Sequence, residues 1–446
     1  MKKGNRHNIT PIVVTYKSSI DFYKEITKKI GNAAQNLPNK FLFLGQQGAN
    51  LWEKIDKTYK AGAKGEVLIE ENFAQINELI KEGSPYKPYD IISLGVGRGM
   101  DDIKILKQIQ IVNKGKIKKF NIYAVDLSSI LLKCGILQIS DWCNGVEATQ
   151  ELKQNIKSIR GIWADFEELP TLKSKLKNDI QLGNNKSLYH LLGLTLGNND
   201  ESVLLKSIYG LMEVEDFLLL GIDFCVSHGE IAISDAEKEY TTGEAAASIN
   251  QFMLGPLHFI STHKKTNNDF YKIANTLDEI KILHGRAKHI SKIDKSVSFT
   301  RTHIFKKEGS RLCDYSTKYE EDSFKRYITE TLKLENVFFE WKECFKAEDV
   351  SKNTQALVLL QKKGIKKKHE VKEATHAFDY ANEISLLKVE IETVEEAKQQ
   401  LLNKIIEKLS SQNIDVNLYK KTFYYSKNNK RKKCLIIEIT ELNKLI

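Results

Sequence analysis

The sequence predicts an α/β fold built on a parallel sheet, and two features of the chain lead to this prediction. The first is the alternation of apolar runs with amphipathic segments between residues 88 and 245, which is typical of strands joined by crossover helices. The second is the stretch YDIISLGVGRGM from Tyr89 to Met100, where an apolar run ends in glycines and leads into a probable helix. A turn of this kind at the carboxyl edge of a parallel sheet predicts a nucleotide-type ligand.

The glycine turn contains Gly95, Gly97 and Gly99. Glycine has no Cβ, so the backbone can approach a ligand closely. The spacing is G-x-G-x-G, shorter than the G-x-G-x-x-G of a dinucleotide site, and it is commoner in S-adenosylmethionine-dependent methyltransferases; the alternative is an ordinary strand-to-helix turn. The next apolar run, FNIYAVDLS, ends in Asp126, whose carboxylate can accept both hydroxyls of a ribose.

Further apolar runs continue the predicted sheet. The run IRGIWADFEEL predicts a strand that is followed directly by Asp165 and Phe166. We expect Asp165 to meet an adenine amino group unless it is a surface carboxylate or a helix cap, and Phe166 is a further predicted cofactor-binding residue. The segment SVSFTRTHIF alternates and is expected to be a further strand. Later sheet strands are expected in YHLLGLTLGN, DFLLLGIDFC, ENVFFEWKECF and QALVLLQKK. The last two are predicted to be an antiparallel pair that closes the sheet.

The chain divides by pattern into four parts. Residues 1–85 have helical apolar spacing and predict an N-terminal helical cap, and residues 86–363 form the sheet domain. Residues 364–384 are charge-rich without an apolar period and predict a linker, followed by a small β-α-β-β module over 385–446. Its predicted hairpin carries five basic side chains, which predict either a solvated loop or a contact with nucleic acid or another acidic partner. They are Lys427, Lys430, Arg431, Lys432 and Lys433.

Composition narrows the functional classes. The net charge of +10 comes from 68 basic and 58 acidic residues that are interspersed, which favours a lysine-rich composition over a dedicated nucleic-acid binder for the body of the chain. Six cysteines are scattered without a C-x-x-C, so we expect a reduced cytoplasmic protein with no disulfide framework and no metal site. No apolar run is long enough to span a membrane, and the N-terminus is not typical of a signal peptide.

Four segments in order resemble the histidine-specific methyltransferase family, whose members trimethylate the α-amino group of histidine. LGLTLGN at 192–198 resembles the family's LGSTIGN, and LPNKFLFLGQQGANLWEKI resembles its N-terminal segment. LLLGIDF and RLCDYSTKY resemble two later segments of the family. The resemblance covers roughly residues 30–362 and implies a Rossmann-like class I methyltransferase sheet with S-adenosylmethionine as the cofactor.

The resemblance also implies roles for individual residues. Gly95, Gly97, Asp126 and Asp165 would hold S-adenosylmethionine, and Asn198 matches the asparagine that contacts the amino and carboxylate groups of the substrate amino acid. Asp314 stands where the family has a glutamate that reads the imidazole, and Tyr59 lies near the tyrosines that line the substrate pocket. Five positions or segments depart from the family. Ser93 stands where a carboxylate often begins the glycine motif, Leu194 replaces a serine, and Asp314 is one methylene shorter than glutamate. The YYPTR segment is reduced to TYKAGAKGE, which keeps one tyrosine, and the family's YD becomes FLG.

The predicted function is transfer of a methyl group to the amino group of an amino acid or related small amine, with Asn198, Asp314 and Tyr59 as candidate catalytic residues. The altered imidazole half of the site favours an acceptor other than histidine. One alternative is a methyltransferase-like binding or effector subunit that senses S-adenosylmethionine or recruits a partner through its C-terminal module. A third hypothesis is an RNA methyltransferase. The chain has no NPPY-type motif for positioning an amine, so this hypothesis ranks below the other two.

Overall fold

The computed structural model describes most of the chain, and the residues that it describes lie in fifteen ranges. These are 11–15, 19–31, 39–59, 61–81, 89–170, 185–193, 195–224, 246–262, 281–287, 290–305, 309–346, 354–364, 386–390, 418–427 and 430–439. Contacts divide the chain into two compact units, Met1–Gly364 and Ile365–Ile446.

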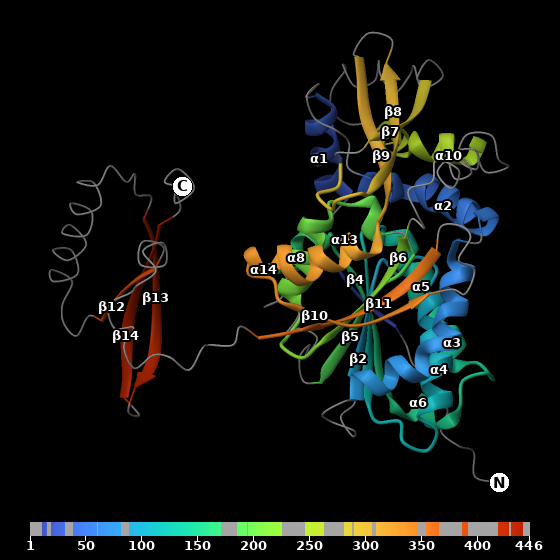
Figure 1. Ribbon diagram of the computed structural model, residues 1–446. Helices are drawn as coiled ribbons and strands as arrows, with labels where there is room; N and C mark the ends of the chain where they lie inside the picture. Colours follow the sequence, from blue (N-terminus) through green and yellow to red (C-terminus); the bar gives the residue numbers. More distant parts are fainter. Residues whose placement is uncertain are drawn as a thin grey trace. The chain divides into compact units, whose positions relative to one another are not determined.

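The first unit is built on an eight-stranded sheet with the order β1-β4-β3-β2-β5-β6-β11-β10 (Figure 1). Its strands are β1 (Ile12–Thr15), β2 (Tyr89–Leu94), β3 (Phe120–Asp126), β4 (Ile156–Trp163), β5 (Lys186–Leu191), β6 (Phe217–Phe224), β10 (Phe339–Lys346) and β11 (Thr354–Lys362). Neighbouring strands from β1 to β6 run parallel, whereas β11 pairs antiparallel with both β6 and β10. The predicted parallel sheet and its antiparallel closing pair are therefore confirmed.

Helices cover both faces of this sheet. The helical elements are α1 (Ser19–Gly31), η1 (Asn39–Phe43), α2 (Gly45–Tyr59), α3 (Ala61–Lys81), α4 (Met100–Val112), α5 (Ser129–Asn144), α6 (Gln150–Asn155), η2 (Phe166–Glu168), η3 (Leu196–Asn198), α8 (Glu201–Leu211), α10 (Ala246–Met253), α11 (Gly255–Thr262), α13 (Glu321–Arg326), η5 (Tyr327–Thr331) and α14 (Leu332–Leu334). Polar side chains start two of the crossover helices, since Ser128 accepts from the N–H of Leu131 and Asp200 accepts from that of Val203.

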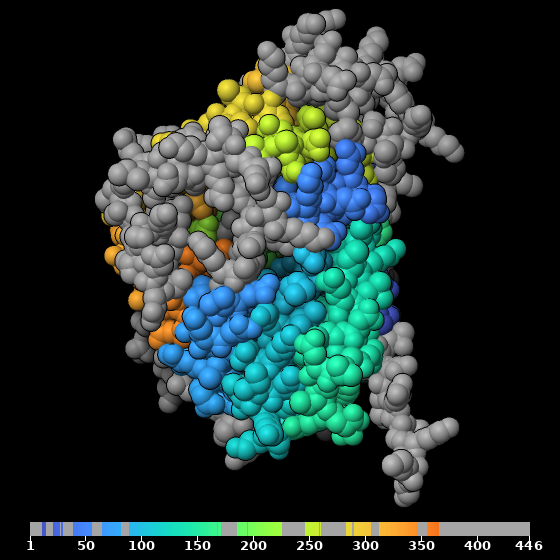
Figure 2. Space-filling view, turned by 90° about the vertical axis from the view of Figure 1, so that its right-hand side faces the viewer, coloured from blue at the N-terminus to red at the C-terminus, as the bar shows by residue number. Residues whose placement is uncertain are grey.

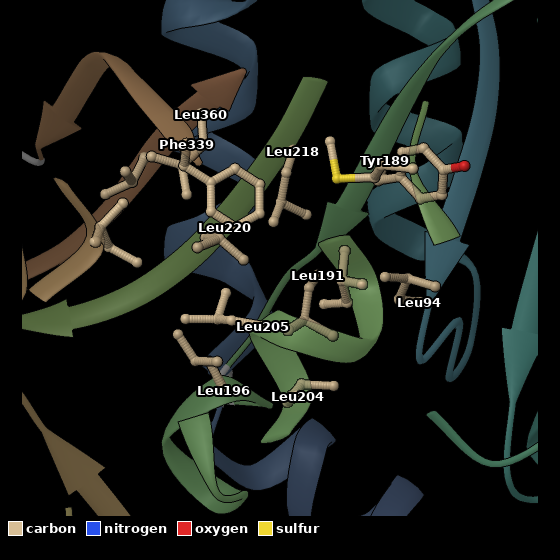
Figure 3. Packing of buried hydrophobic residues seen from close by; sticks show 14 of the residues in the cluster. Leu94, Tyr189, Leu191, Leu196, Leu204, Leu205, Leu218, Leu220, Phe339 and Leu360 are labelled. Carbon is tan, nitrogen blue, oxygen red and sulfur yellow. The ribbon is translucent and has the colours of Figure 1, made fainter. Parts of the chain in front are cut away.

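Successive strand residues feed two separate cores, which is why the parallel strands are almost continuously apolar. On one face, Leu94 and Tyr189 pack with α8, α13 and α14; Figure 3 shows part of this cluster. On the other face, Ile91 and Leu188 pack with α3, α4 and α5. Burying a side chain of this size contributes about 1.5–3 kcal/mol, so each core stabilises the sheet strongly.

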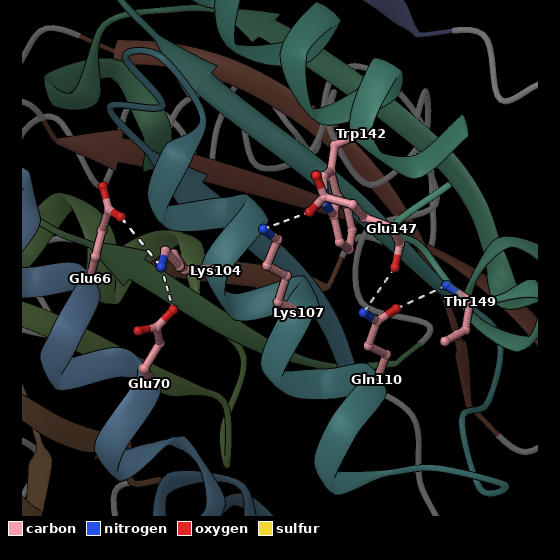
Figure 4. Close-up of polar contacts among 8 residues, drawn as sticks. All are labelled: Glu66, Glu70, Lys104, Lys107, Gln110, Trp142, Glu147 and Thr149. Carbon is pink, nitrogen blue, oxygen red and sulfur yellow. Dashed lines mark hydrogen bonds and ion pairs between the residues drawn. The ribbon is translucent and has the colours of Figure 1, made fainter. Parts of the chain in front are cut away.

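Polar contacts link the outer surfaces of α3, α4 and α5, which lie side by side over one face (Figure 2). Lys104 on α4 pairs with Glu70 and Glu66 on α3, while Lys107 Nζ lies 2.7 Å from Glu147 Oε2 beyond α5 (Figure 4). Exposed pairs of this kind contribute only about 0–1 kcal/mol each, so the apolar core beneath them holds the helices in place.

A smaller antiparallel sheet stands at the carboxyl edge of the large one. It consists of β7 (Lys281–Ala287), β8 (Val297–Phe305) and β9 (Gly309–Lys318) in the order β7-β8-β9. A third apolar cluster, which includes Phe22, Phe41, Phe252 and Cys313, joins β9 to α1, η1 and α10. The small sheet and these helices together form a roof over one end of the large sheet (Figure 1).

The N-terminal part has two features beyond the predicted helical cap. Residues 12–15 form β1, which extends the large sheet next to β4. Helix α3 packs on the face of the large sheet, where Phe73 is fully buried, and does not belong to the roof. The helix that the apolar spacing of this segment predicts is confirmed, but the surface that it covers depends on tertiary packing.

The second unit contains β12 (Leu386–Glu390), β13 (Leu418–Lys427) and β14 (Lys430–Ile439) in an antiparallel sheet of order β12-β14-β13. These strands include the predicted hairpin. The predicted helix of this module and nearly all of the predicted linker lie outside the described residues. Within the ranges given above, no helix combines the length and apolar character needed to cross a membrane.

Candidate active site

The candidate site lies at the carboxyl edge of the large sheet, where the strand order reverses. From β2 the chain proceeds outward through β3 and β4, and later returns to build β5 and β6 on the other side. In open α/β sheets, ligands bind beside such a reversal. The loops after β2, β3, β4 and β5 carry most of the residues that the sequence singled out.

The glycine turn and Asp126 meet directly. The N–H of Gly97 donates to Asp126 Oδ2 at 3.2 Å, and the N–H of Ser128 donates to Oδ1 at 2.8 Å. Gly97 has a φ of +50°, and a Cβ added there would meet nothing closer than the carbonyl oxygen of Gly95 at 4.0 Å. This open, left-handed turn leaves room for a ligand against the backbone.

Burial raises the pKa of Asp126 to about 6. The hydrogen bonds from the backbone N–H groups of Ser128, Gly97 and Leu127 partly oppose this rise. The carboxylate is thus ionised at neutral pH, with two oxygens fixed beside the turn. This arrangement suits the acceptance of hydroxyl protons from a ribose.

Gly99 has a different position from the other two glycines. A Cβ there would lie 2.8 Å from the carbonyl oxygen of Gly135 and 2.9 Å from the side chain of Ile139, both on α5. Gly99 therefore allows the start of α4 to pack against α5. The structure gives it a packing role, and direct contact with the cofactor remains a prediction.

A buried polar cluster joins the strands on either side of the reversal. Ser93 Oγ donates to Asp102 Oδ2, and His190 Nε2 lies 3.1 Å from Asp102 Oδ1. Ser93 and His190 are register partners on β2 and β5, and all three side chains are at most 2% exposed. The glycine turn, the start of α4 and the end of β5 are thereby fixed relative to one another.

Asp165 and Phe166 follow β4 as predicted, but Asp165 already has a charged partner. Lys40 Nζ lies 2.7 Å from Asp165 Oδ2 and 3.2 Å from Glu25 Oε1. The ring of Phe166 lies 3.5 Å from the Cβ that Gly95 lacks, so it faces the glycine turn. The pairing with Lys40 ties the roof to the end of β4, and a contact of Asp165 with adenine remains a prediction.

Asn198 lies in η3, the next element after β5, and Asn39 in the roof holds its backbone. The Nδ2 group of Asn39 donates to the carbonyl oxygens of Asn198 at 2.7 Å and Tyr315 at 2.9 Å, joining η3 to β9. The Oδ1 atom of Asn198 is buried and accepts no hydrogen bond from the described part of the chain. A buried amide oxygen without a donor is costly, and a ligand N–H would satisfy it.

Asp314 lies on β9 in the roof, opposite Arg301 on β8. The two side chains form a buried ion pair between Arg301 Nη1 and Asp314 Oδ2, and each residue is 5% exposed. Further along β9, Lys318 pairs with Asp223 at the end of β6, which anchors the roof to the large sheet a second time.

Tyr59 ends α2, but its side chain is outside the described part of the structure. Sequence reasoning missed Asn39, Lys40 and Arg301. The first two stand in the LPNKF segment, which carried part of the family resemblance. No local pattern reveals Arg301, because its partner comes from the neighbouring strand.

Comparisons with known proteins place this geometry in context. A family model described as histidine-specific, S-adenosylmethionine-dependent methyltransferase matches residues 22–348. An S-adenosylmethionine-dependent methyltransferase from Methanosarcina mazei has 11% identity and a TM-score of 0.31, covering 63% of this chain and 95% of that chain. The 1,6-didemethyltoxoflavin-N1-methyltransferase of Burkholderia thailandensis has 11% identity and a TM-score of 0.30, covering 80% and 95%. Among curated proteins, no match to the sequence was found.

Proposed function

Because the chain belongs to the histidine-specific, S-adenosylmethionine-dependent methyltransferases, we propose that it methylates the amino nitrogen of an amino acid or related small amine. The chain is a methyltransferase, and S-adenosylmethionine is its methyl donor. The observation that carries the proposed acceptor class is the buried Oδ1 atom of Asn198, since a carbonyl oxygen accepts a hydrogen bond from an amine N–H.

The residues at the glycine turn fit the cofactor. The open backbone at Gly97 would approach it closely, and Asp126 would accept the ribose hydroxyls. Phe166 presents an aromatic ring beside Gly95, where it would pack against a flat base. When bound, S-adenosylmethionine supplies a methyl group on a positively charged sulfur.

In the proposed reaction the protein acts mainly by positioning. Asn198 would hold the amine by one N–H, so that the nitrogen lone pair points at the methyl group. The amine must be neutral to attack, and burial favours the neutral form. Holding two reactants in line can contribute roughly 7–11 kcal/mol toward lowering the barrier.

Two other candidate residues have proposed roles around the acceptor. Asp314 would contact the part of the acceptor that lies beneath the roof. Tyr59 would place its ring near the methylated product, because a cationic ammonium group is attracted to an aromatic face by about 0.5–2 kcal/mol. Both roles derive from the family resemblance.

The proposal is tested by incubating the full chain with S-adenosylmethionine and each of the twenty amino acids and common amines, and measuring release of S-adenosylhomocysteine. At least one acceptor should be turned over. Asn198→Ala should lower that turnover by about tenfold or more through loss of the hydrogen bond, with unchanged cofactor affinity.

Asn199→Ala is a matched control, because the Asn199 side chain bonds the carbonyl oxygen of Thr195 within its own turn. Cofactor binding without turnover of any amine would contradict the proposal and favour a sensor or effector protein.

A further inference from the structure

The strand register divides the sheet of the second unit into two unlike faces. β14 lies between β12 and β13 and pairs antiparallel with both (Figure 1). Register partners in an antiparallel pair share a face, and successive residues of a strand alternate between the two faces. One face, called the apolar face below, has six aliphatic residues at its register positions: Leu387, Val389, Leu418, Leu435, Ile437 and Ile439.

The opposite face, called the basic face below, has more lysines than glutamates at its register positions. The lysines are Lys388, Lys421, Lys427, Lys430 and Lys432, and the glutamates are Glu390 and Glu438. The alternation thus divides the basic residues of the hairpin, because Arg431 and Lys433 fall on the apolar face. The lysines that remain on the basic face suit a polyanion.

Aromatic residues stand among these lysines. Phe423 and Tyr425 occupy the basic face of β13, and Lys432 is the register partner of Tyr425. The two aromatic residues are two positions apart, which is about 6.6 Å along a strand. On sheet surfaces that bind single-stranded nucleic acid, bases stack on aromatic side chains while cationic side chains neutralise the phosphates. A duplex keeps its base faces stacked on one another, so this combination favours a single strand.

We propose that the basic face of the second unit binds single-stranded nucleic acid, with bases stacked on Phe423 and Tyr425 and the lysines beside the phosphates. An acidic peptide would match the charge but offers no row of flat bases. The apolar face is where we expect the predicted helix of this module, whose residues lie outside those described. This activity is separate from the proposed amine methylation, whose residues lie in the first unit.

The test is fluorescence anisotropy with the full chain and four labelled probes: a short oligouridylate, its oligothymidylate counterpart, a duplex of the same length, and poly-glutamate. Single strands should bind at least about tenfold more tightly than the duplex or poly-glutamate at the same salt concentration. Phe423→Leu and Tyr425→Leu remove a stacking surface but keep an apolar side chain. Each should weaken single-strand binding about 5- to 150-fold. The two single strands show whether the sugar is read.

The alternation along β13 supplies matched controls. Tyr424 stands between Phe423 and Tyr425 but on the apolar face, so Tyr424→Leu should keep the affinity of the parent. Lys421→Gln should reduce the log–log salt slope by about 0.7, whereas Lys420→Gln, one position away on the apolar face, should leave it unchanged. Circular dichroism and thermal unfolding identify the folded variants, and the lysine pair tests the proposal if an aromatic variant does not fold.

Three results would overturn the proposal. The first is equal affinity for the single strands, the duplex and poly-glutamate, which would identify a surface for acidic partners in general. The second is parental affinity in folded Phe423→Leu and Tyr425→Leu. The third is an equal loss of binding in Tyr424→Leu and Tyr425→Leu. None of these results bears on amine methylation, which the acceptor screen tests separately.

Discussion

Replacing Asp126 with asparagine is expected to weaken S-adenosylmethionine binding and to remove its dependence on pH. In the wild type, the carboxylate is fixed by N–H groups of Gly97 and Ser128 and would accept the ribose hydroxyls. Asparagine retains one carbonyl oxygen but loses the charge. A hydrogen bond to a charged group contributes about 1.5–3 kcal/mol, so the dissociation constant should rise about 10- to 150-fold.

The pH dependence follows from the raised pKa of Asp126, which is about 6 in the folded protein because of burial. Hydroxyl donors on the ribose stabilise the ionised carboxylate, so cofactor binding should lower the raised pKa of Asp126. Binding near pH 6 should therefore release a proton. Below pH 6 binding must first ionise the group. Between pH 7 and pH 5 the ionised fraction falls about tenfold, and the affinity should fall by a similar factor.

Isothermal titration of S-adenosylmethionine from pH 5 to pH 8, in buffers of different ionisation enthalpy, measures both the affinity and the released proton. Asp141→Asn, an exposed substitution of the same kind on α5, is the control and should behave like the parent. An affinity that is constant across this pH range, or an Asp126→Asn variant that binds like the parent, would refute the assignment.

Two further perturbations test the packing of α4 against α5 and the independence of the second unit. Gly99→Ala should lower the free energy of unfolding by about 2–4 kcal/mol in urea titrations. The new side chain would sit at a left-handed φ, and its Cβ would lie 2.8 Å from the carbonyl oxygen of Gly135 on α5. Unchanged stability would show that α4 and α5 can move apart without cost. A chain that ends at Lys363 should stay folded and keep its cofactor affinity by calorimetry. If the hairpin lysines contact phosphates, nucleic-acid binding by the full chain should fall with salt, by about 0.7–0.9 in log–log slope per contact, and a shortened chain that still binds would locate that contact elsewhere.

Local patterns predicted the large sheet because its strands are apolar on both faces. The turn at Gly97 and the carboxylate of Asp126 could be paired in advance, since both follow strands that end at the same edge of the sheet. The four residues of β1 were not recognised as a strand. A four-residue segment is too short to show the alternation of polar and apolar side chains that marks a strand. Its pairing with β4 also depends on contacts between residues far apart in sequence.

The roof could not be derived from local patterns. β7 and β9 are two strands of a three-stranded antiparallel sheet, and the pairing of Arg301 with Asp314 depends on a register that shifts at a bulge. Asn39 shows no motif of its own, because its bonds reach residues 159 and 276 positions away. Only the resemblance to a family placed Asp314 and Asn198 in one site.

The position of β11 has a consequence for synthesis of the chain. β11 pairs with β6 although Leu359 and Leu219 are far apart in sequence, and β6 has β5 as its other neighbour. While residues 354–362 are still inside the ribosome, β6 is an edge strand with an unpaired backbone and apolar side chains such as Leu218 and Leu220. The sheet therefore closes late, through a contact of high sequence separation, and such contacts form slowly. Nascent or truncated chains that lack β11 therefore expose the edge of β6 as a template for intermolecular strand pairing, and we expect them to aggregate more readily than chains in which β11 has paired.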